Sequence, residues 1–236
     1  MRVGTDSNTR LLVRLALRCT LLLCLVFAPV VHTDDFMVPT TATARIEQQY
    51  GTTAYLRIKE WHNLIKTSRN VSHIEKLRRV NTFINQVAFI HDIDHWGVED
   101  YWATPQQFLA TNGGDCEDFS IAKYFTLRQM GIPAENLRLT YVKALKLNQA
   151  HMVLTYFESP GADPLVLDNL NTNIQKSSSR DDLLPVYSFN GEGLWLAKAR
   201  GIEQRVGKPE RLSRWKEVVA RINTEQAPSV GTRFNQ

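Results

Sequence analysis

The clearest pattern in the chain is a repeat of apolar positions at helical spacing in its first half. The stretch from Thr40 to about Ile90 is predicted to be helical, and the signal is strongest from Val71 onward. Ser72 and Glu75 form a capping-box pair there, which is typical of a helix start. The apolar stripes predict helix faces packed into a core, and they consist of Leu77, Val80, Ile84, Val87 and Ile90, preceded by Tyr55, Ile58, Trp61 and Ile65.

The pattern changes in the second half. Residues 91–114 are polar and irregular, and a helix is then predicted from Cys116 to Met130, because glycines stand before it and Gly131 follows it. Helices followed by consecutive antiparallel strands predict an α+β fold in which the Cys116 helix packs on the sheet. The later elements predicted are strands at 137–145, 152–157 and 165–170, a polar loop at 171–182, a strand pair within 187–195 and a helix at 208–223.

The composition is that of an ordinary globular domain with extensions. The 236 residues are 43% apolar and 22% charged, which excludes a disordered tail, a collagen and a polytopic membrane protein. Three cysteines are too few for a disulfide-rich scaffold. The net charge of +4 is mild, and the basic residues form no patch or stripe. We therefore expect no nucleic-acid partner.

Residues 1–33 have the pattern of an export signal. Four arginines precede or flank an uncharged run of 13 residues, 19–31. This run is shorter than the roughly 20 residues that a bilayer-spanning helix needs. We expect a cleaved signal, with an uncleaved inner-membrane anchor as the alternative. Cleavage near Thr33 would leave 24 basic and 23 acidic side chains, and Cys116 would be the single cysteine.

Cys116 stands where a nucleophile is favoured. Free backbone N–H groups at the start of a helix stabilise a thiolate and can hold an oxyanion. His151 opens the second predicted strand, and Asp168 lies near the end of the third. If these strands are neighbours, the three side chains can form a thiol–imidazole pair steadied by a carboxylate. Each residue alone also has an ordinary explanation, as a small buried thiol, a surface histidine and a turn aspartate.

The acids next to the predicted nucleophile conflict with this role, since nearby carboxylates raise the pKa of a thiol. Two interpretations stay open. Asp115, Glu117 and Asp118 either cap the helix and point away from the thiol, or they bind a cation. Oxygen ligands suit Ca²⁺, which takes about six to eight of them. Asp92 or Asp94 in the upstream loop would complete such a ligand set.

Several motifs resemble those of the bacterial transglutaminase-like cysteine proteinases, over about residues 45–200. The resemblance implies a papain-like, transglutaminase-type fold and a calcium-dependent endopeptidase with Cys116, His151 and Asp168 as its triad. It also implies that Asp115 and Glu117 are calcium ligands, to which we add Asp92. The motifs are Asp100-Tyr101-Trp102-Ala103-Thr104-Pro105, Gly114-Asp115-Cys116-Glu117-Asp118-Phe119, Ala150-His151-Met152-Val153-Leu154 and Leu167-Asp168-Asn169-Leu170.

The same resemblance implies a location and two partners. The protease would act in the periplasm on a large repeat adhesin, cutting it near its N-terminus to release it and disperse biofilm. An inner-membrane cyclic-di-GMP receptor would sequester the protease. The expected organisation is a signal or anchor at 1–33, a protease domain at 40–205, and a C-terminal helix with a polar tail at 206–236. The alternatives are an acyl-transferring transglutaminase or amidase with the same triad, and a non-catalytic binding module.

Overall fold

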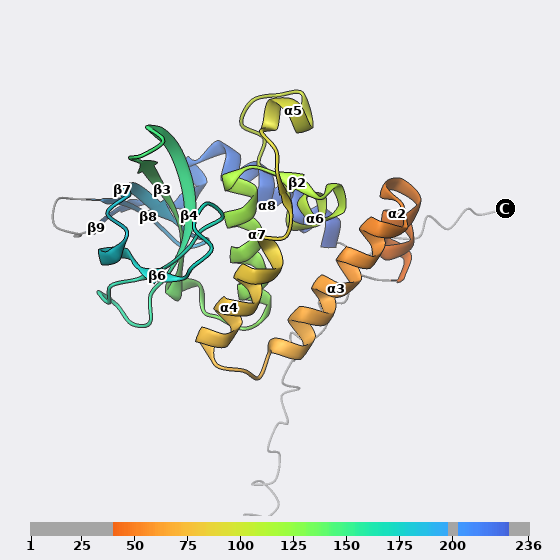
Figure 1. Cartoon of the computed structure of the whole chain (residues 1–236), viewed down its shortest axis with the longest axis horizontal. Helices are drawn as coiled ribbons and strands as arrows, with labels where there is room; N and C mark the ends of the chain where they lie inside the picture. The colour runs from red at the N-terminus through yellow and green to blue at the C-terminus, as the bar shows by residue number, and fades with distance from the viewer. Residues whose placement is uncertain (1–39, 198–202, 227–236) are drawn as a thin grey trace, which may run out of the picture. The chain divides into compact units, whose positions relative to one another are not determined.

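The computed structural model describes residues 40–197 and 203–226 (Figure 1). The leader predicted at 1–33 and the end of the polar tail, from 227, lie outside the described residues. The signal or anchor therefore stays a prediction. In the part of the chain that is described, no helix has both the length and the apolar character needed to cross a bilayer.

Three helices begin the described chain and confirm the helical pattern of the first half. They are α2 (Thr40–Tyr50), α3 (Thr52–Ser68) and α4 (His73–Ile84). Ser72 caps α4, because its hydroxyl accepts a hydrogen bond from the backbone N–H of Glu75 at 3.3 Å. Most residues of the predicted apolar stripes are buried, including Ile58, Trp61 and Ile65 on α3 and Leu77, Val80 and Ile84 on α4.

The helix predicted from Val71 to Ile90 was wrong at its C-terminal end, since α4 stops at Ile84. Beyond it, β1 (Ala88–Phe89) pairs in parallel with β2 (Gly113–Gly114), and Ile90 donates its backbone N–H to the Gly114 carbonyl. This approach depends on glycine, because a Cβ at Gly113 would lie 2.6 Å from the Ile90 side chain. Pairing with β2, which is distant in sequence, thus outweighs the helical spacing of the apolar residues in this segment.

The stretch predicted to be polar and irregular contains two short helices, α5 (Asp92–Trp96) and α6 (Pro105–Thr111). α6 begins with a capping box, in which the side chains of Thr104 and Gln107 accept hydrogen bonds from each other's backbone N–H groups. Pro105 suits the first helical position. These signals are visible in the sequence, but both helices are too short to show an apolar period.

The strands of the second half form one antiparallel sheet, on which α7 (Cys116–Gln129) packs through β4 (Figure 1). The order of the seven strands is β6-β5-β4-β3-β7-β8-β9, and β6 and β9 were not predicted. The predicted α+β fold is confirmed. The strands are β3 (Leu137–Ala144), β4 (Gln149–Tyr156), β5 (Leu165–Leu167), β6 (Gln175–Lys176), β7 (Leu183–Phe189), β8 (Leu194–Ala197) and β9 (Glu203–Gly207). The short helix η1 (Ala134–Asn136) precedes β3, and η2 (Ser177–Ser179) lies between β6 and β7.

The sheet order brings the second and third predicted strands together. β4 lies between β3 and β5, and Leu154 of β4 pairs with Leu167 of β5. β4 begins at Gln149, so His151 lies within the strand instead of opening it, opposite Val142 of β3. Asp168 follows directly after the last residue of β5. His151 and Asp168 are therefore carried by neighbouring strands of the sheet.

The last described helix joins the same core. The helix predicted from 208 begins later, because the short helix η4 (Pro209–Arg211) precedes α8 (Ser213–Gln226). Trp215 is 4% exposed and stacks on Phe125 of α7, with ring centroids 5.6 Å apart. It also meets Phe189 of β7 edge-on. One aromatic side chain thus links α8 to both the helix of Cys116 and the sheet.

Truncation of this aromatic anchor is expected to destabilise the whole domain. We expect Trp215→Ala to lower the free energy of unfolding by about 3–5 kcal/mol, because it leaves a cavity among buried rings. Lys216→Ala, at the exposed next position, is the control and should change it by less than about 0.5 kcal/mol. Urea unfolding measures both. A loss below about 1 kcal/mol for Trp215→Ala would mean that α8 is not integral to the core.

Candidate active site

Cys116 is the first residue of α7, where the backbone N–H groups of the first turn lack helical acceptors. The preceding Gly113–Gly114 pairs with β1, which fixes the entry into the helix. Its side chain is partly buried, and Cys116 is the one cysteine among the described residues, with a free thiol. The predicted position of the thiol at a helix N-terminus is confirmed.

The surroundings of the thiol favour its neutral form. Its Sγ donates a hydrogen bond to Glu117 Oε2 at 2.8 Å. Burial raises the pKa of Cys116 well above its usual value, and the negative charges of Glu117 and Asp115 raise it further. A hydrogen bond from the backbone of Met152 opposes this rise. Because Met152 follows His151 on β4, this contact places the thiol beside the strand that carries the histidine.

His151 and Asp168 form a buried pair. Their Nε2 and Oδ1 atoms are 2.8 Å apart, and both residues are at most 2% exposed. Burial alone would raise the pKa of Asp168, but hydrogen bonds from His151 and Arg180 outweigh it and hold that pKa well below its usual range. An ionised Asp168 requires Nε2 to be the donor, which leaves His151 Nδ1 as the nitrogen able to accept a proton.

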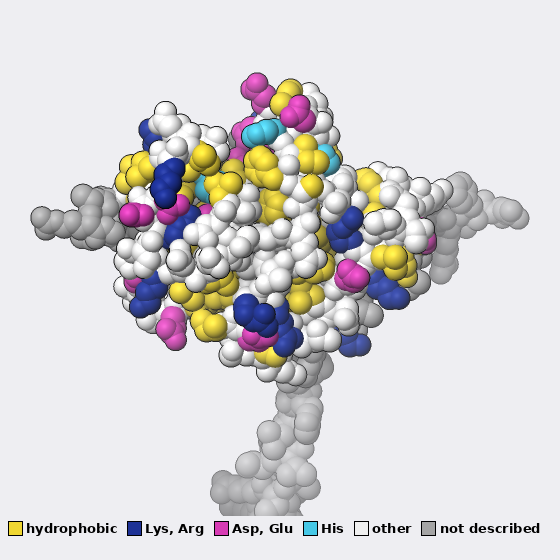
Figure 2. All heavy atoms as spheres, viewed as in Figure 1, with side chains coloured by type: hydrophobic (Ala, Val, Ile, Leu, Met, Phe, Trp, Pro, Cys, Tyr) yellow, Lys and Arg dark blue, Asp and Glu magenta, His cyan; other side chains and the backbone are white. Residues whose placement is uncertain are grey.

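Four acidic residues gather around Cys116. The carboxylates of Asp92, Asp115 and Asp118 have oxygens within 4.8 Å of one another, and the same holds for the ligand atoms of Asp115, Cys116 and Glu117. Asp92 comes from α5, whose surroundings show acidic and histidine side chains in Figure 2. Of the two upstream acids considered from the sequence, Asp92 joins the cluster. The other, Asp94, is exposed and takes no part in either group.

The cluster carries more negative charge than its surroundings support. Burial, followed by the charge of Asp115, raises the pKa of Asp92 to about 6. Burial and the neighbouring Glu117 raise the pKa of Asp115 to about 8. Burial likewise raises the pKa of Asp118 well above its usual range. Adjacent carboxylates of this kind ionise together only when a cation compensates them.

The donor set fits a hard cation. The Oδ1 atoms of Asp92 and Asp115 are both buried and have no hydrogen-bond partner among the described residues. Buried carboxylate oxygens without partners are costly, and oxygen atoms are the ligands that Ca²⁺ prefers. Asp118, which stands in the same motif, is not one of the ligands implied by the family resemblance, but its carboxylate joins the cluster. It also acts as a cap, accepting a hydrogen bond from the Asp115 backbone N–H at 3.4 Å.

The segment before α6 supports the cluster through its backbone. Tyr101 donates its N–H to Asp92 Oδ2, and Ala103 donates its N–H to Asp118 Oδ1. Trp102, between them, is 5% exposed and stacks on Phe189. Its burial and ring contact favour a structural role.

Gly114 lies against the cluster, so a side chain there is expected to disturb it. A Cβ at this position would meet Asp118 Oδ2 at 2.4 Å and Phe108 at 2.7 Å. We expect Gly114→Ala to cost about 1–3 kcal/mol of stability in urea unfolding, because the site is overpacked. Gly191→Ala is the control, since its nearest contact is an ordinary 3.5 Å to the Tyr124 hydroxyl. Equal stability of the two variants would contradict the close packing described here.

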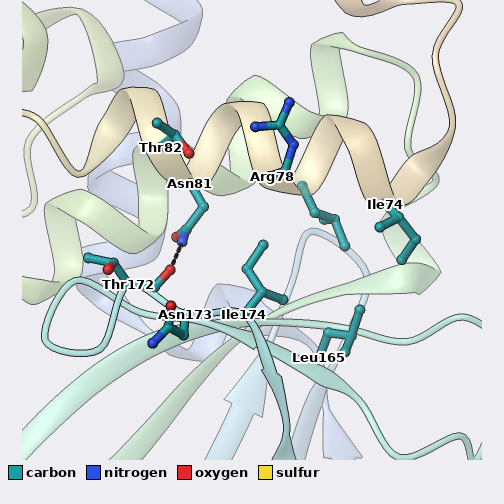
Figure 3. Close-up of a pocket in the computed structure, with 9 residues that line it drawn as sticks. Ile74, Arg78, Asn81, Thr82, Leu165, Thr172, Asn173 and Ile174 are labelled. Atoms are coloured by element: carbon teal, nitrogen blue, oxygen red, sulfur yellow. Dashed lines mark hydrogen bonds between the residues drawn. The ribbon is translucent and has the colours of Figure 1, made fainter.

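A separate cavity of about 410 Å³ lies between α4 and residues 172–174 (Figure 3). Apolar side chains of Ile74, Leu165 and Ile174 line it, and Asn81 closes one side by donating to the Thr172 carbonyl at 2.8 Å. None of the predicted site residues lines this cavity. It is therefore distinct from the candidate active site.

Residues 55–195 match the family model of the bacterial transglutaminase-like cysteine proteinase, which includes every residue discussed above for the site. No curated protein matches the chain.

Solved structures of Legionella pneumophila LapG share the fold at 42% sequence identity. The EGTA-treated form has a TM-score of 0.69, and the match covers 77% of this chain and 96% of that one. A second LapG structure, with a TM-score of 0.68, covers the same shares. The calcium-bound form has a TM-score of 0.67 and covers 77% of this chain and 98% of its own.

Proposed function

Because the chain belongs to the bacterial transglutaminase-like cysteine proteinases, we propose that it is a calcium-dependent periplasmic endopeptidase whose nucleophile is Cys116. In this proposal it cleaves the N-terminal region of a large repeat adhesin, which releases the adhesin from the cell surface and promotes biofilm dispersal. An inner-membrane cyclic-di-GMP receptor sequesters the protease. The export signal predicted at 1–33 is the basis for the periplasmic location.

The observation that carries the proposal is the buried pair of His151 and Asp168. This pair lies next to Met152 of β4, whose backbone contacts the Cys116 thiol. His151 Nδ1 removes the thiol proton, and the sulfur attacks the scissile carbonyl. His151 then returns the proton to the leaving amine, while Asp168 stabilises the imidazolium. The backbone N–H of Cys116, the first residue of α7, helps to hold the developing oxyanion. Water hydrolyses the thioester to complete the reaction.

The calcium part of the proposal rests on the acidic cluster. Asp115, Glu117 and Asp92 would hold the ion, and Asp118 is close enough to join them. Bound calcium would supply positive charge that compensates the clustered carboxylates. Glu117, which accepts the thiol hydrogen bond, would then be a ligand of the ion. Structures of Legionella pneumophila LapG in calcium-bound and EGTA-treated forms support this choice of ion.

Cleavage of a natural substrate tests the proposed activity. The purified protein, incubated with an adhesin encoded next to it, is expected to release an N-terminal fragment. N-terminal sequencing of the larger product identifies the bond that is cut. An intact adhesin in the presence of Ca²⁺ would contradict the proposed substrate, even if the thiol is reactive.

Two other functions are separated by the same assay. A transglutaminase or amidase would form the same thioester but pass the acyl group to an amine, so a labelled amine would enter the product. A binding module would leave the substrate whole and its thiol unreactive. The buried His151–Asp168 hydrogen bond favours catalysis over binding alone, because a surface used only for docking has no need of it.

A further inference from the structure

Arg180 lies behind the His151–Asp168 pair, on the side away from the imidazole. Its side chain is 2% exposed, and its Nη2 donates to Asp168 Oδ2 at 2.7 Å. The guanidinium is itself anchored, because Nε and Nη2 each donate to a different oxygen of Asp182 at 2.8 Å. Such a two-point contact fixes the plane of an arginine side chain.

Asp168 is consequently held at both carboxylate oxygens and at its backbone carbonyl. Its Oδ1 accepts hydrogen bonds from His151 Nε2 and from the Leu170 backbone N–H, while Oδ2 accepts from Arg180. Its backbone carbonyl accepts from Asn85 Nδ2 at 2.9 Å, at the end of α4. The carboxylate therefore has one orientation, with Oδ1 toward the histidine.

We propose that Arg180 is a positioning residue that keeps Asp168 a hydrogen-bond acceptor and thereby fixes the His151 tautomer whose Nδ1 can take the thiol proton. This inference rests on the proposed function, because it assigns a role to Arg180 within the Cys116, His151 and Asp168 triad. A protonated Asp168 would donate to Nε2 instead. The proton of the imidazole would then sit on Nδ1, which could no longer accept one from sulfur.

Three titratable or charged groups face Asp168: His151 from β4, Arg180 after η2 and Lys123 from α7. Lys123 is fully buried, and burial lowers its pKa to about 7, so its charge is lost as the pH rises. Arg180 stays charged at all pH values used for assay. It is therefore the cation that holds Asp168 ionised throughout the working range.

Loss of the guanidinium should appear as a change in the pH profile. Without Arg180, the pKa of Asp168 rises, so the carboxylate is protonated at a higher pH than in the wild type. We expect Arg180→Gln to lower kcat about 10- to 100-fold at pH 6, with KM within about twofold, and to move the acid limb of the profile to higher pH. Arg180→Lys should restore most of the acid limb, because it keeps a charge beside Asp168.

The imidazole tautomer gives a second readout. Proton–nitrogen NMR of labelled protein should show the His151 proton on Nε2 in the wild type and a mixture of tautomers in Arg180→Gln. If that variant does not fold, Asp182→Asn carries the test. This substitution removes the negative charge of Asp182, a partly exposed residue that anchors the Arg180 guanidinium. It should shift the acid limb of the pH profile in the same direction as Arg180→Gln, but by a smaller amount.

Arg57→Gln is the control, since this partly buried guanidinium bonds the Leu109 carbonyl on another helix. A folded Arg180→Gln protein with the wild-type pH profile and tautomer would overturn the inference. A fall in kcat without either change would also overturn it, because that result indicates a structural role. If the wild-type protein does not cleave or alkylate, the proposed function fails instead, and the tautomer measurement still decides the role of Arg180.

Discussion

Replacing Cys116 by alanine is expected to abolish cleavage while the protein stays folded. The attacking atom is lost, and no other cysteine occurs among the described residues. In a triad whose members act as a unit, such a loss costs on the order of 10⁴-fold or more in kcat. Cleavage of the adhesin is followed by gel electrophoresis, with circular dichroism and thermal unfolding to verify the fold.

Stability should change little in this variant. The side chain lies at the start of α7 and is only partly buried, so its removal leaves a small gap. Cys116→Ser is the matched variant, since it keeps the shape and offers a hydroxyl, which is a poorer nucleophile in this setting. Cleavage at the wild-type rate by folded Cys116→Ala would remove the thiol from the proposed mechanism.

Removal of calcium is expected to have the second large effect. Four carboxylates converge beside the thiol, and two of their oxygens have no partner among the described residues. Ca²⁺ at 100 times its dissociation constant should add about 2.7 kcal/mol to the stability of the folded state. In a domain of this size that is a rise in Tm of about 5–10 °C. Excess chelator should reverse the rise and stop cleavage.

Two aspartates of α5 provide a matched pair for this experiment. Asp92 is buried in the cluster, whereas Asp94 is exposed and outside it. Asp92→Asn should weaken the calcium-dependent rise in Tm, because it removes a charged ligand, and Asp94→Asn should leave it unchanged. The Tm is measured by calorimetry across a calcium titration. Cleavage that persists in excess chelator, together with a Tm that does not change with calcium concentration, would exclude the metal from the mechanism.

The placement of the nucleophile was accessible from the sequence because its signals are local. Glycines before Cys116 and after Gln129 delimit α7, and the strands that carry His151 and precede Asp168 have clear apolar patterns. The α+β fold followed from the order of these elements. Each of these features depends on residues a few positions apart, which periodicity and capping describe directly.

The surroundings of the site were less accessible because they depend on long-range contacts. β1 and β2 are two residues each and pair across the intervening segment, which ended α4 early. Arg180 lies in a stretch predicted to be a polar loop. No feature of the neighbouring residues indicates its ion pair with Asp168, from which β6 separates it along the chain. The sequence left Asp118 open as a helix cap or as part of a cation site, and the structure shows that its carboxylate both caps α7 and joins the acidic cluster.

The most direct test of the triad is the rate at which iodoacetamide alkylates Cys116 in the presence of Ca²⁺ at pH 7. Mass spectrometry of the peptide that contains Cys116 follows the reaction in the wild type and in His151→Ala. We expect the wild-type thiol to react faster than a free cysteine and the variant thiol to react more slowly, because the imidazole no longer takes the proton. Equal rates for the wild type, the variant and free cysteine would contradict the assignment of Cys116 and His151 as a catalytic pair.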